Sequence, residues 1–161
     1  PEALKAFKEQ GYKLVVITNQ AGVARGYYTE DDVKELHRYM NELLEKAGAG
    51  IDAFYYCPHH PEHGIGKYKI QCHCRKPETG MFEMAEQDFT VDKSKSWMIG
   101  DKLIDIEAGR NYGVRTVLVG TGYGAGVHEE QKKQGDFPYD LYAEDLLEAY
   151  DEINRETAGN L

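Results

Sequence analysis

The chain has 161 residues, of which 41% are hydrophobic and 29% are charged, and its net charge at neutral pH is −9. This length suits one domain with a sizeable core, and no apolar run approaches the roughly 20 residues of a membrane-spanning helix. The start of the chain shows no signal-peptide pattern. Negative charge spread along the chain argues against nucleic acid as the main partner, because such binders usually carry a basic stripe. We expect a single domain over residues 1–161, a small-molecule partner, no membrane contact and, by default, a monomer.

Helices and strands are expected to alternate along the chain. Apolar periodicity and capping residues predict helices at residues 2–10, 29–46, 79–85, 104–112 and 144–153. Short β-branched or apolar runs predict strands at residues 13–18, 51–56, 97–99 and 114–119, with a weak edge strand at 141–142. Four glycines between 120 and 126 predict a loop. Repeated strand–helix units of this length are typical of a doubly wound, three-layer, Rossmann-like α/β domain with a parallel sheet.

The helix expected from Thr29 to Lys46 should pack through Val33, Leu36, Leu43 and Leu44, with Thr29 as its N-cap. Ligands of doubly wound sheets bind at the carboxyl ends of the strands. Here those ends carry Thr18-Asn19, Cys57, Asp101 and the loop after Gly120, a polar rim able to hold a metal.

All three cysteines lie between positions 57 and 74, interleaved with histidines. An odd, tight cluster of this kind indicates metal binding in a reducing cytosol rather than a secreted disulfide framework. Cys57, Cys72 and Cys74 with one imidazole would form a closed, structural zinc site. His59 fits best as the fourth ligand, because C-x-H and C-x-C pairs each reach one ion; the alternatives are the other nearby histidines, His60, His63 and His73. The competing interpretation is free cysteines beside incidental histidines.

Arg75-Lys76-Pro77 follows the last cysteine directly. Pro77 restricts the backbone of Lys76, so zinc on Cys74 would fix where both cations point. Lys76 suits a phosphate as a compact charge, and the planar guanidinium of Arg75 suits a polar substrate group. A solvated basic pair on a loop is the alternative.

Two further motifs close strands. Gly100 permits a sharp turn that leaves Asp101 where a divalent cation could sit, and Asp105 lies one helical turn on, able to support Asp101 or Lys102. An ordinary acidic helix start is the alternative. Thr18-Asn19-Gln20 offers a hydroxyl and backbone amides to phosphate oxygens, although a plain turn would look the same.

In this order the motifs resemble the haloacid dehalogenase (HAD) phosphatase superfamily: Thr18-Asn19 matches its second motif, Lys76 its third, and Gly100-Asp101 with Asp105 its fourth. The strings TNQAGVARG, YYCPHHPE, CHCRKPETGMF and MIGDKLIDIEAG are most similar to the heptose-bisphosphate phosphatase family. The zinc loop, residues 57–76, is the specific part, since most superfamily members lack it. Histidinol-phosphatase relatives share it with a shorter gap than the twelve residues between His59 and Cys72.

The resemblance implies a capless, Mg²⁺-dependent phosphoric monoester hydrolase of the cytoplasm. It would remove the 7-phosphate of D-glycero-D-manno-heptose 1,7-bisphosphate in lipopolysaccharide-precursor metabolism, through an aspartyl-phosphate. Asp101 would hold Mg²⁺, with Lys102 near the metal, while Thr18 and Lys76 would stabilise the phosphoryl oxygens. Arg75 would recognise the substrate away from the reacting phosphate. The same site would be lined by Asn19, Gln20 and Ala21.

One motif of the superfamily has no counterpart here. Its D-x-D-G-T segment, which carries the nucleophile and the acid/base aspartate, belongs on a strand before the first helix, and residues 1–161 contain no D-x-D. We therefore expect a longer parent protein, with a central strand between those at residues 13–18 and 97–99, and no turnover by this chain alone. Three alternatives remain: a histidinol-phosphate phosphatase, a non-catalytic zinc-binding module, and a phosphotransferase or response-regulator-like domain.

Overall fold

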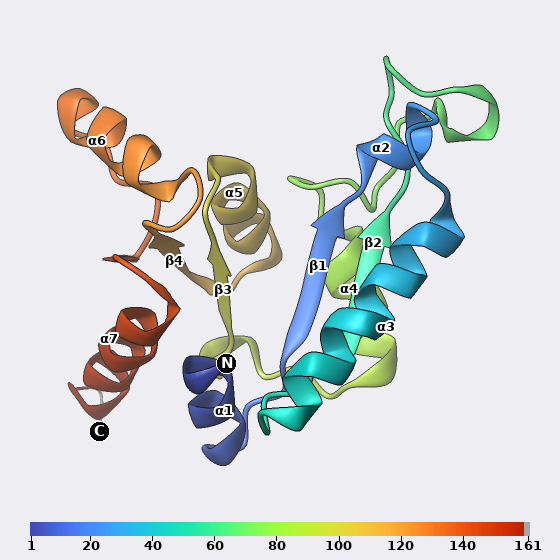
Figure 1. The fold of residues 1–161 in the computed structure, drawn as a ribbon. Helices are drawn as coiled ribbons and strands as arrows, with labels where there is room; N and C mark the ends of the chain where they lie inside the picture. The colour runs from blue at the N-terminus through green and yellow to red at the C-terminus, as the bar shows by residue number, and fades with distance from the viewer. Residues whose placement is uncertain (160–161) are drawn as a thin grey trace. The chain divides into compact units, whose positions relative to one another are not determined.

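The computed structural model describes residues 1–159. The chain divides into two compact units, the first being Pro1–Thr90 and the second beginning at Val91 (Figure 1). The first unit contains α1 (Glu2–Glu9), β1 (Val15–Asn19), α2 (Ala21–Ala24), α3 (Glu30–Lys46), β2 (Ala53–Cys57), the 3₁₀ turn η1 (Gly66–Tyr68) and α4 (Gly80–Asp88). The second contains η2 (Lys93–Lys95), β3 (Trp97–Gly100), α5 (Leu103–Tyr112), β4 (Arg115–Val119), α6 (Gly124–Gln134), β5 (Leu141–Ala143) and α7 (Leu146–Gly159). No described helix is both long and apolar enough to cross a bilayer.

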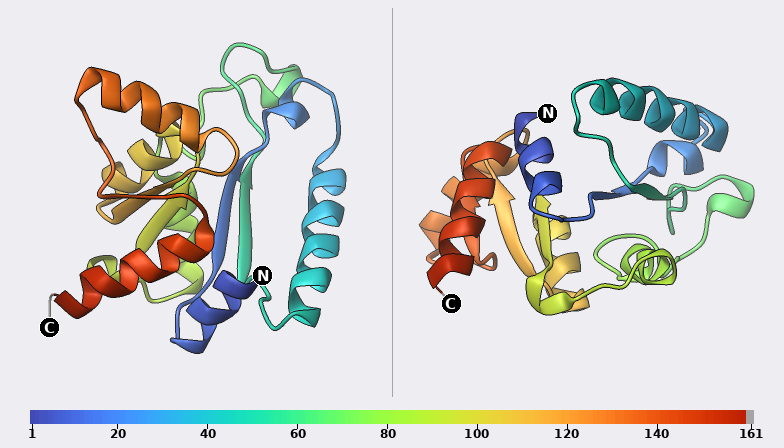
Figure 2. Two further views of the ribbon diagram at one scale, coloured as in Figure 1. Left: turned by 60° about the vertical axis from the view of Figure 1, so that its left-hand side comes forward. Right: turned by 90° about the horizontal axis from the view of Figure 1, so that it is seen from below.

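The first unit is built on two parallel strands. β1 and β2 pair from Val15 opposite Ala53 to Asn19 opposite Cys57. Helices α3 and α4 cover opposite faces of this pair (Figure 2). On the α4 face, Tyr55 and Cys57 pack with Met81 and other apolar side chains, since alternate strand residues point to the same side. The polar ends of both strands therefore reach the same edge, where the metal-loop residues begin.

Helix α3 begins as expected and packs differently from expectation. The hydroxyl of Thr29 accepts from the Asp32 amide while the Asp32 carboxylate accepts from the Thr29 amide, a reciprocal cap. Val33 is buried, but Leu36 and Leu43 are 54% and 50% exposed, so their predicted place on the inner side is wrong. His37 is buried instead, with its ring stacked on Phe54 of β2 at 4.5 Å. The periodicity located the helix, whereas the contact with Phe54 decided which face is inside.

The second unit is a parallel sheet in the order β3-β4-β5. Helix α5 contacts β3 and β4, α6 contacts β4, and α7 contacts β4 and β5. Ile106, Leu118 and Tyr139 form a buried cluster between α5, β4 and the segment before β5. The weak edge strand predicted at 141–142 is present as β5.

The loop predicted at residues 120–126 is wrong for its second half, because α6 begins at Gly124. A Cβ at position 124 would lie 1.5 Å from the Val119 carbonyl oxygen, so glycine is required there by close packing at the helix start. The α/β class and parallel pairing are confirmed, with the described strands in two sheets, one in each unit.

Candidate metal centre and phosphate-binding residues

Four of the predicted metal ligands meet at the end of β2. The Sγ atoms of Cys57, Cys72 and Cys74 and one ring nitrogen of His59 all lie within 4.8 Å of one another. His59 Nδ1 is 3.8 Å from the Cys57 Sγ and 3.6 Å from the Cys74 Sγ. Cys57 is fully buried at the last position of β2, and the other ligands come from the adjoining loop. Three sulfurs and one imidazole at this spacing are the donor set of a structural zinc site.

The protonation of the sulfurs supports this interpretation. The neighbouring Cys74 thiol and His59 lower the pKa of Cys57 to about 5, while the Cys57 and Cys72 sulfurs raise the pKa of Cys74. The first effect arises because a thiolate at Cys57 accepts hydrogen bonds, and the second because a further negative charge beside it is unfavourable. A divalent cation would offset the repulsion between neighbouring thiolates, because it stabilises all three of them together.

The other histidines lie outside this cluster. The His60 ring accepts hydrogen bonds from the amides of Glu62 and His63. His73 contacts the carboxylates of Glu78 and Glu83. Of the four candidate imidazoles, the structure therefore brings His59 alone to the sulfurs within the described residues.

Asn19, the last residue of β1, makes two hydrogen bonds to the main chain of Lys76. Its Oδ1 accepts from the Lys76 amide at 2.9 Å, and its Nδ2 donates to the Lys76 carbonyl at 3.3 Å. The Lys76 ammonium donates to the carbonyl of Ile17 at 3.4 Å, near the end of the same strand. The amide of Asn19 thus fixes the position of Lys76, two residues beyond Cys74.

Thr18 and Gln20 form a second polar link at the same strand end. The Thr18 hydroxyl accepts from Gln20 Nε2 at 3.1 Å, and Gln20 Oε1 accepts from the Tyr28 hydroxyl at 2.6 Å. Ala21 begins α2 immediately afterwards. The sequence did not predict a role for Tyr28. The glycine at position 22 is a sign of its position, because a Cβ there would lie 2.2 Å from the Tyr28 ring.

Arg75 is half-buried, and its Nη1 is buried without a hydrogen-bond partner in the described part of the chain. An unpaired buried donor costs free energy unless it finds an acceptor. Arg75 is therefore equipped to receive an anionic or carbonyl oxygen of a ligand.

In the second unit, Asp101 follows β3 directly. Its Oδ2 accepts from the amide of Tyr123 at 3.1 Å, and its Oδ1 has no hydrogen-bond partner among residues 1–159. Gly122, with φ of 63°, makes this approach possible, because a Cβ there would lie 2.3 Å from Asp101 Oδ2. One carboxylate oxygen is thus oriented by the glycine loop and the other is available to a hard cation.

Asp105 is buried beneath the turn between β3 and α5. Its Oδ2 accepts from the Lys102 amide at 3.2 Å at the start of α5. A Cβ at position 100 would lie 2.4 Å from the Asp105 Cβ, which explains glycine at that position. The Lys102 ammonium lies 4.8 Å from the centre of the Tyr123 ring. Asp105 therefore holds the backbone at the start of α5 through the Lys102 amide.

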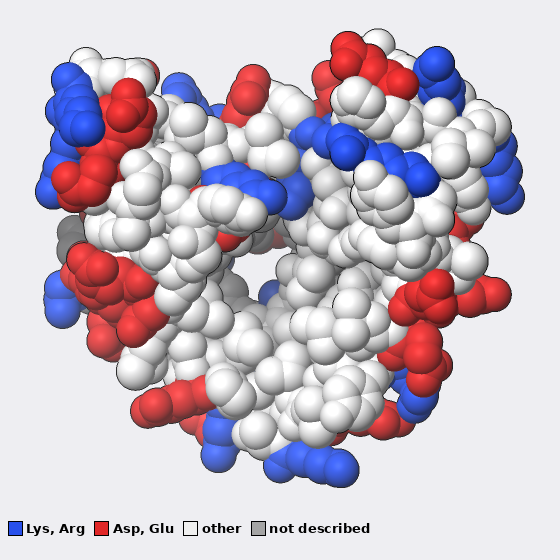
Figure 3. Space-filling model, turned by 45° about the horizontal axis from the view of Figure 1, so that its top comes forward, with Lys and Arg blue, Asp and Glu red and all other residues white. Residues whose placement is uncertain are grey.

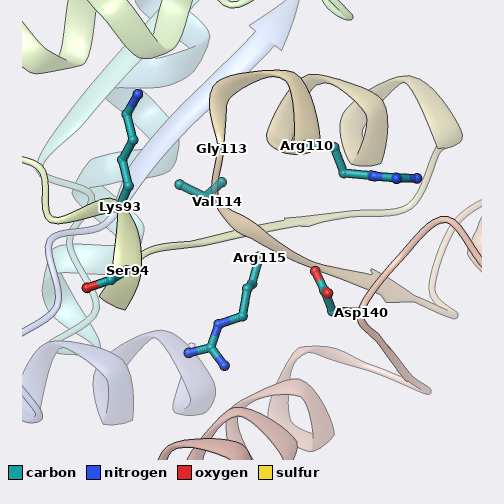
Figure 4. Close-up of a pocket in the computed structure, with 7 residues that line it drawn as sticks. All are labelled: Lys93, Ser94, Arg110, Gly113, Val114, Arg115 and Asp140. Carbon is teal, nitrogen blue, oxygen red and sulfur yellow. The ribbon is translucent and has the colours of Figure 1, made fainter.

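A cavity of about 420 Å³ in the second unit involves none of these residues (Figure 4). It lies at the opposite edge of the sheet, where β4 begins at Arg115, and its charged ends diverge: Lys93, Arg110 and Arg115 point apart. In Figure 3, acidic side chains are spread over the surface of both units, in keeping with the net charge of −9. The cavity contains none of the predicted site residues, so it does not compete with the strand-end residues as a candidate site.

Comparison with known proteins identifies the family. Residues 73–149 match the HAD-hydrolase-like family model. The chain is 46% identical over 133 residues to a D-glycero-beta-D-manno-heptose-1,7-bisphosphate 7-phosphatase of Haemophilus ducreyi, an overlap covering 81% of this chain and 72% of that protein. It is 43% identical over 153 residues to the D-glycero-D-manno-heptose-1,7-bisphosphate 7-phosphatase of Chlorobaculum tepidum, covering 92% and 75%.

A solved structure agrees with these relatives. The crystal structure of D,D-heptose 1,7-bisphosphate phosphatase from B. bronchiseptica, complexed with magnesium and phosphate, superposes with a TM-score of 0.78 at 30% identity. The match covers 96% of this chain and 81% of that one. The chain therefore belongs to the heptose-1,7-bisphosphate 7-phosphatase family of HAD-type hydrolases.

Proposed function

We propose that this chain carries substrate- and metal-binding residues of a phosphoric monoester hydrolase that removes the 7-phosphate of D-glycero-D-manno-heptose 1,7-bisphosphate. The observation that carries the proposal is the 46% identity to a relative of that name, over 81% of the chain. The fixed position of Lys76 supports the proposal because it holds a cation ready for a phosphoryl group, and the cluster of candidate metal ligands anchors the loop that carries Lys76.

Each residue has a specific part in the proposal. Lys76 and the Thr18 hydroxyl bind the oxygens of the phosphoryl group being transferred, where charge develops in the transition state. Arg75, with its unpaired buried donor, binds a polar group elsewhere on the substrate. Asn19 and Gln20 hold Lys76 and Thr18 in place through the hydrogen bonds described above.

Two metals are proposed. Zn²⁺ on Cys57, His59, Cys72 and Cys74 holds the loop and takes no part in the chemistry. Asp101, near Lys102, would hold Mg²⁺, which would supply positive charge to a phosphate group. The structural relative with magnesium and phosphate bound supports this assignment. The attacking aspartate has no candidate among residues 1–161, and its place in a D-x-D segment stays a prediction.

Phosphate release from paired substrates tests the proposal. We expect the protein isolated from its source to hydrolyse the heptose bisphosphate with a higher kcat/KM than histidinol phosphate. Lys76→Met should lower kcat/KM by roughly 10²-fold or more, whereas Lys69→Met, an exposed loop lysine, should not. A preference for histidinol phosphate would support that second branch, and binding of either ester without release would support a non-catalytic module.

Native mass spectrometry of the same protein tests the expected zinc content and oligomeric state. One zinc per chain and a monomer are the expected results. A cytoplasmic location is expected because the three thiols need a reducing compartment to stay available to metal.

A further inference from the structure

The outer part of the metal loop is held by something other than the metal. The four candidate ligands all lie at the base of the loop, at positions 57, 59, 72 and 74. Residues 60–70 extend beyond them and include the short turn η1. An excursion of this length would be mobile if the metal were its only attachment.

Glu30, the first residue of α3, bridges this excursion to the strand beneath it. Its Oε1 accepts from the Tyr56 hydroxyl at 2.9 Å, and its Oε2 accepts from the Tyr68 hydroxyl at 2.7 Å. Tyr56 precedes Cys57 on β2, and Tyr68 ends η1 in the outer loop. Both carboxylate oxygens are therefore used, one toward the sheet and one toward the loop.

Two backbone contacts reinforce the same docking. The Ile65 amide donates to the Ala24 carbonyl at 2.7 Å, which joins the outer loop to the end of α2. The His60 amide donates to the Tyr68 carbonyl at 3.0 Å, which closes the loop on itself. The Tyr68 ring also lies 6.2 Å from the ring of His59. The outer loop is thus attached to the segment between β1 and α3, independently of the sulfurs.

The charge state of Glu30 suits this part. The Tyr68 and Tyr56 hydroxyls hold the pKa of the Glu30 carboxyl below its usual range. Hydrogen bonds from a neutral hydroxyl to a carboxylate are among the stronger ones available to a protein. The bridge is consequently complete at neutral pH.

We propose that Glu30 is a positioning residue that docks the outer metal loop, residues 60–70, through Tyr68 and Tyr56, and so sets how substrate reaches Arg75 and Lys76. The second half of this statement rests on the proposed function, and the first half does not. The rival account is that zinc alone orders the whole loop.

Trypsin cleavage of the zinc-loaded protein separates the two accounts. Lys67 and Lys69 are exposed in the outer loop and serve as the cleavage sites. Glu30→Ala should speed cleavage there by about tenfold or more with zinc content unchanged, since two bonds to a charged group are lost. Asp31→Ala is the matched control, an exposed acid in the same helical turn. It should cleave like the parent protein.

Two tyrosine variants keep the test independent of any defect in α3. Tyr68→Phe retains the ring and loses only the hydrogen bond that joins the loop to Glu30, so it should reproduce the effect of Glu30→Ala. Tyr56→Phe should have the smaller effect, because the link between Glu30 and Tyr68 survives. Cleavage equal to that of the parent in both Glu30→Ala and Tyr68→Phe, with zinc bound, would overturn the proposal.

Steady-state kinetics tests the functional half. With heptose bisphosphate as substrate, Glu30→Ala should raise KM several-fold with a smaller change in kcat, and Glu30→Gln, which still accepts hydrogen bonds, should recover part of the loss. An unchanged KM in Glu30→Ala, despite faster loop cleavage, would refute the link to substrate. If the parent protein does not hydrolyse the bisphosphate, the proposed function fails while the cleavage result still decides the docking.

Discussion

Two asparagines of the first unit use their side-chain amides in the same way. Asn19 makes reciprocal bonds with the main chain of Lys76, and Asn41 makes them with the main chain of Ile51. Asn19→Ala and Asn41→Ala should each lower the free energy of unfolding by about 1–3 kcal/mol, because backbone groups lose their partners. Only Asn19→Ala should also weaken inorganic phosphate binding, by roughly tenfold. Urea denaturation and calorimetric titration measure the two effects, and equal phosphate affinity in both variants would contradict the role given to Asn19.

Alanine substitutions at two glycines of the second unit can distinguish the effect of backbone strain from an effect on metal binding. Gly122 and Gly135 have similar positive φ values of 63° and 69°, but a Cβ would meet Asp101 Oδ2 only at position 122. Alanine at either position should cost about 1 kcal/mol of stability. Gly122→Ala should in addition weaken Mg²⁺ binding, because it displaces the carboxylate. Titration with Mg²⁺ alone is the measurement, and equal Mg²⁺ affinity in the two variants would count against Asp101 as the ligand.

The packing of α3 on β2 has a pH dependence of its own. Burial lowers the pKa of His37 from 6.5, so His37 binds a proton more readily in the unfolded chain than in the folded one. This contribution to stability is complete above about pH 6.5 and is lost as pH falls from there toward the folded pKa. His37→Phe should therefore lose less free energy of unfolding than the parent between pH 7 and pH 5.5. Both proteins must be zinc-saturated, since the metal ligands bind protons in the same range, and parallel pH curves would exclude His37 as the source.

Elements that depend on local pattern were predictable, and those decided by a distant contact were not. The strands at 13–18, 51–56, 97–99 and 114–119 were located within two residues, because runs of apolar residues specify buried strands. Helix α3 and its Thr29 cap were found, yet Leu36 and Leu43 were placed on the wrong face. The start of α6 was missed because Gly124 looks like loop chemistry, whereas close packing against Val119 requires it.

The candidate site shows the same division. Spacing alone grouped Cys57, His59, Cys72 and Cys74, which the structure brings within reach of one ion. The bridge from Glu30 to Tyr56 and Tyr68 spans 26 and 38 positions of sequence and leaves no local pattern. Likewise Asn19 was expected at the substrate, and its amide is engaged with Lys76 57 positions away. Pairings between distant polar side chains follow from the fold and could not precede it.

At the scale of the whole molecule, a net charge of −9 opposes the approach of an anionic substrate. Local cations such as Arg75 and Lys76 act at short range, while the overall field acts over a Debye length of about 10 Å at 0.1 M salt. We expect kcat/KM for the bisphosphate to rise as ionic strength increases from about 0.01 to 0.1 M, because screening removes the long-range repulsion first. Stopped-time assays at fixed free Mg²⁺ measure this, with different neutral salts as the control. A steady fall over the same range would mean that local attraction dominates the encounter.

The reciprocal bonds between Asn19 and Lys76 have a thermodynamic consequence for the neighbouring cluster. Cys74 and Lys76 are separated by one residue, so the backbone that presents Lys76 to an anion is the backbone that carries a candidate metal ligand. Thermodynamic linkage then requires that bound zinc and bound phosphate change each other's binding affinity by the same factor. If bound zinc tightens phosphate binding, phosphate esters protect the thiolates against competing chelators by the same factor.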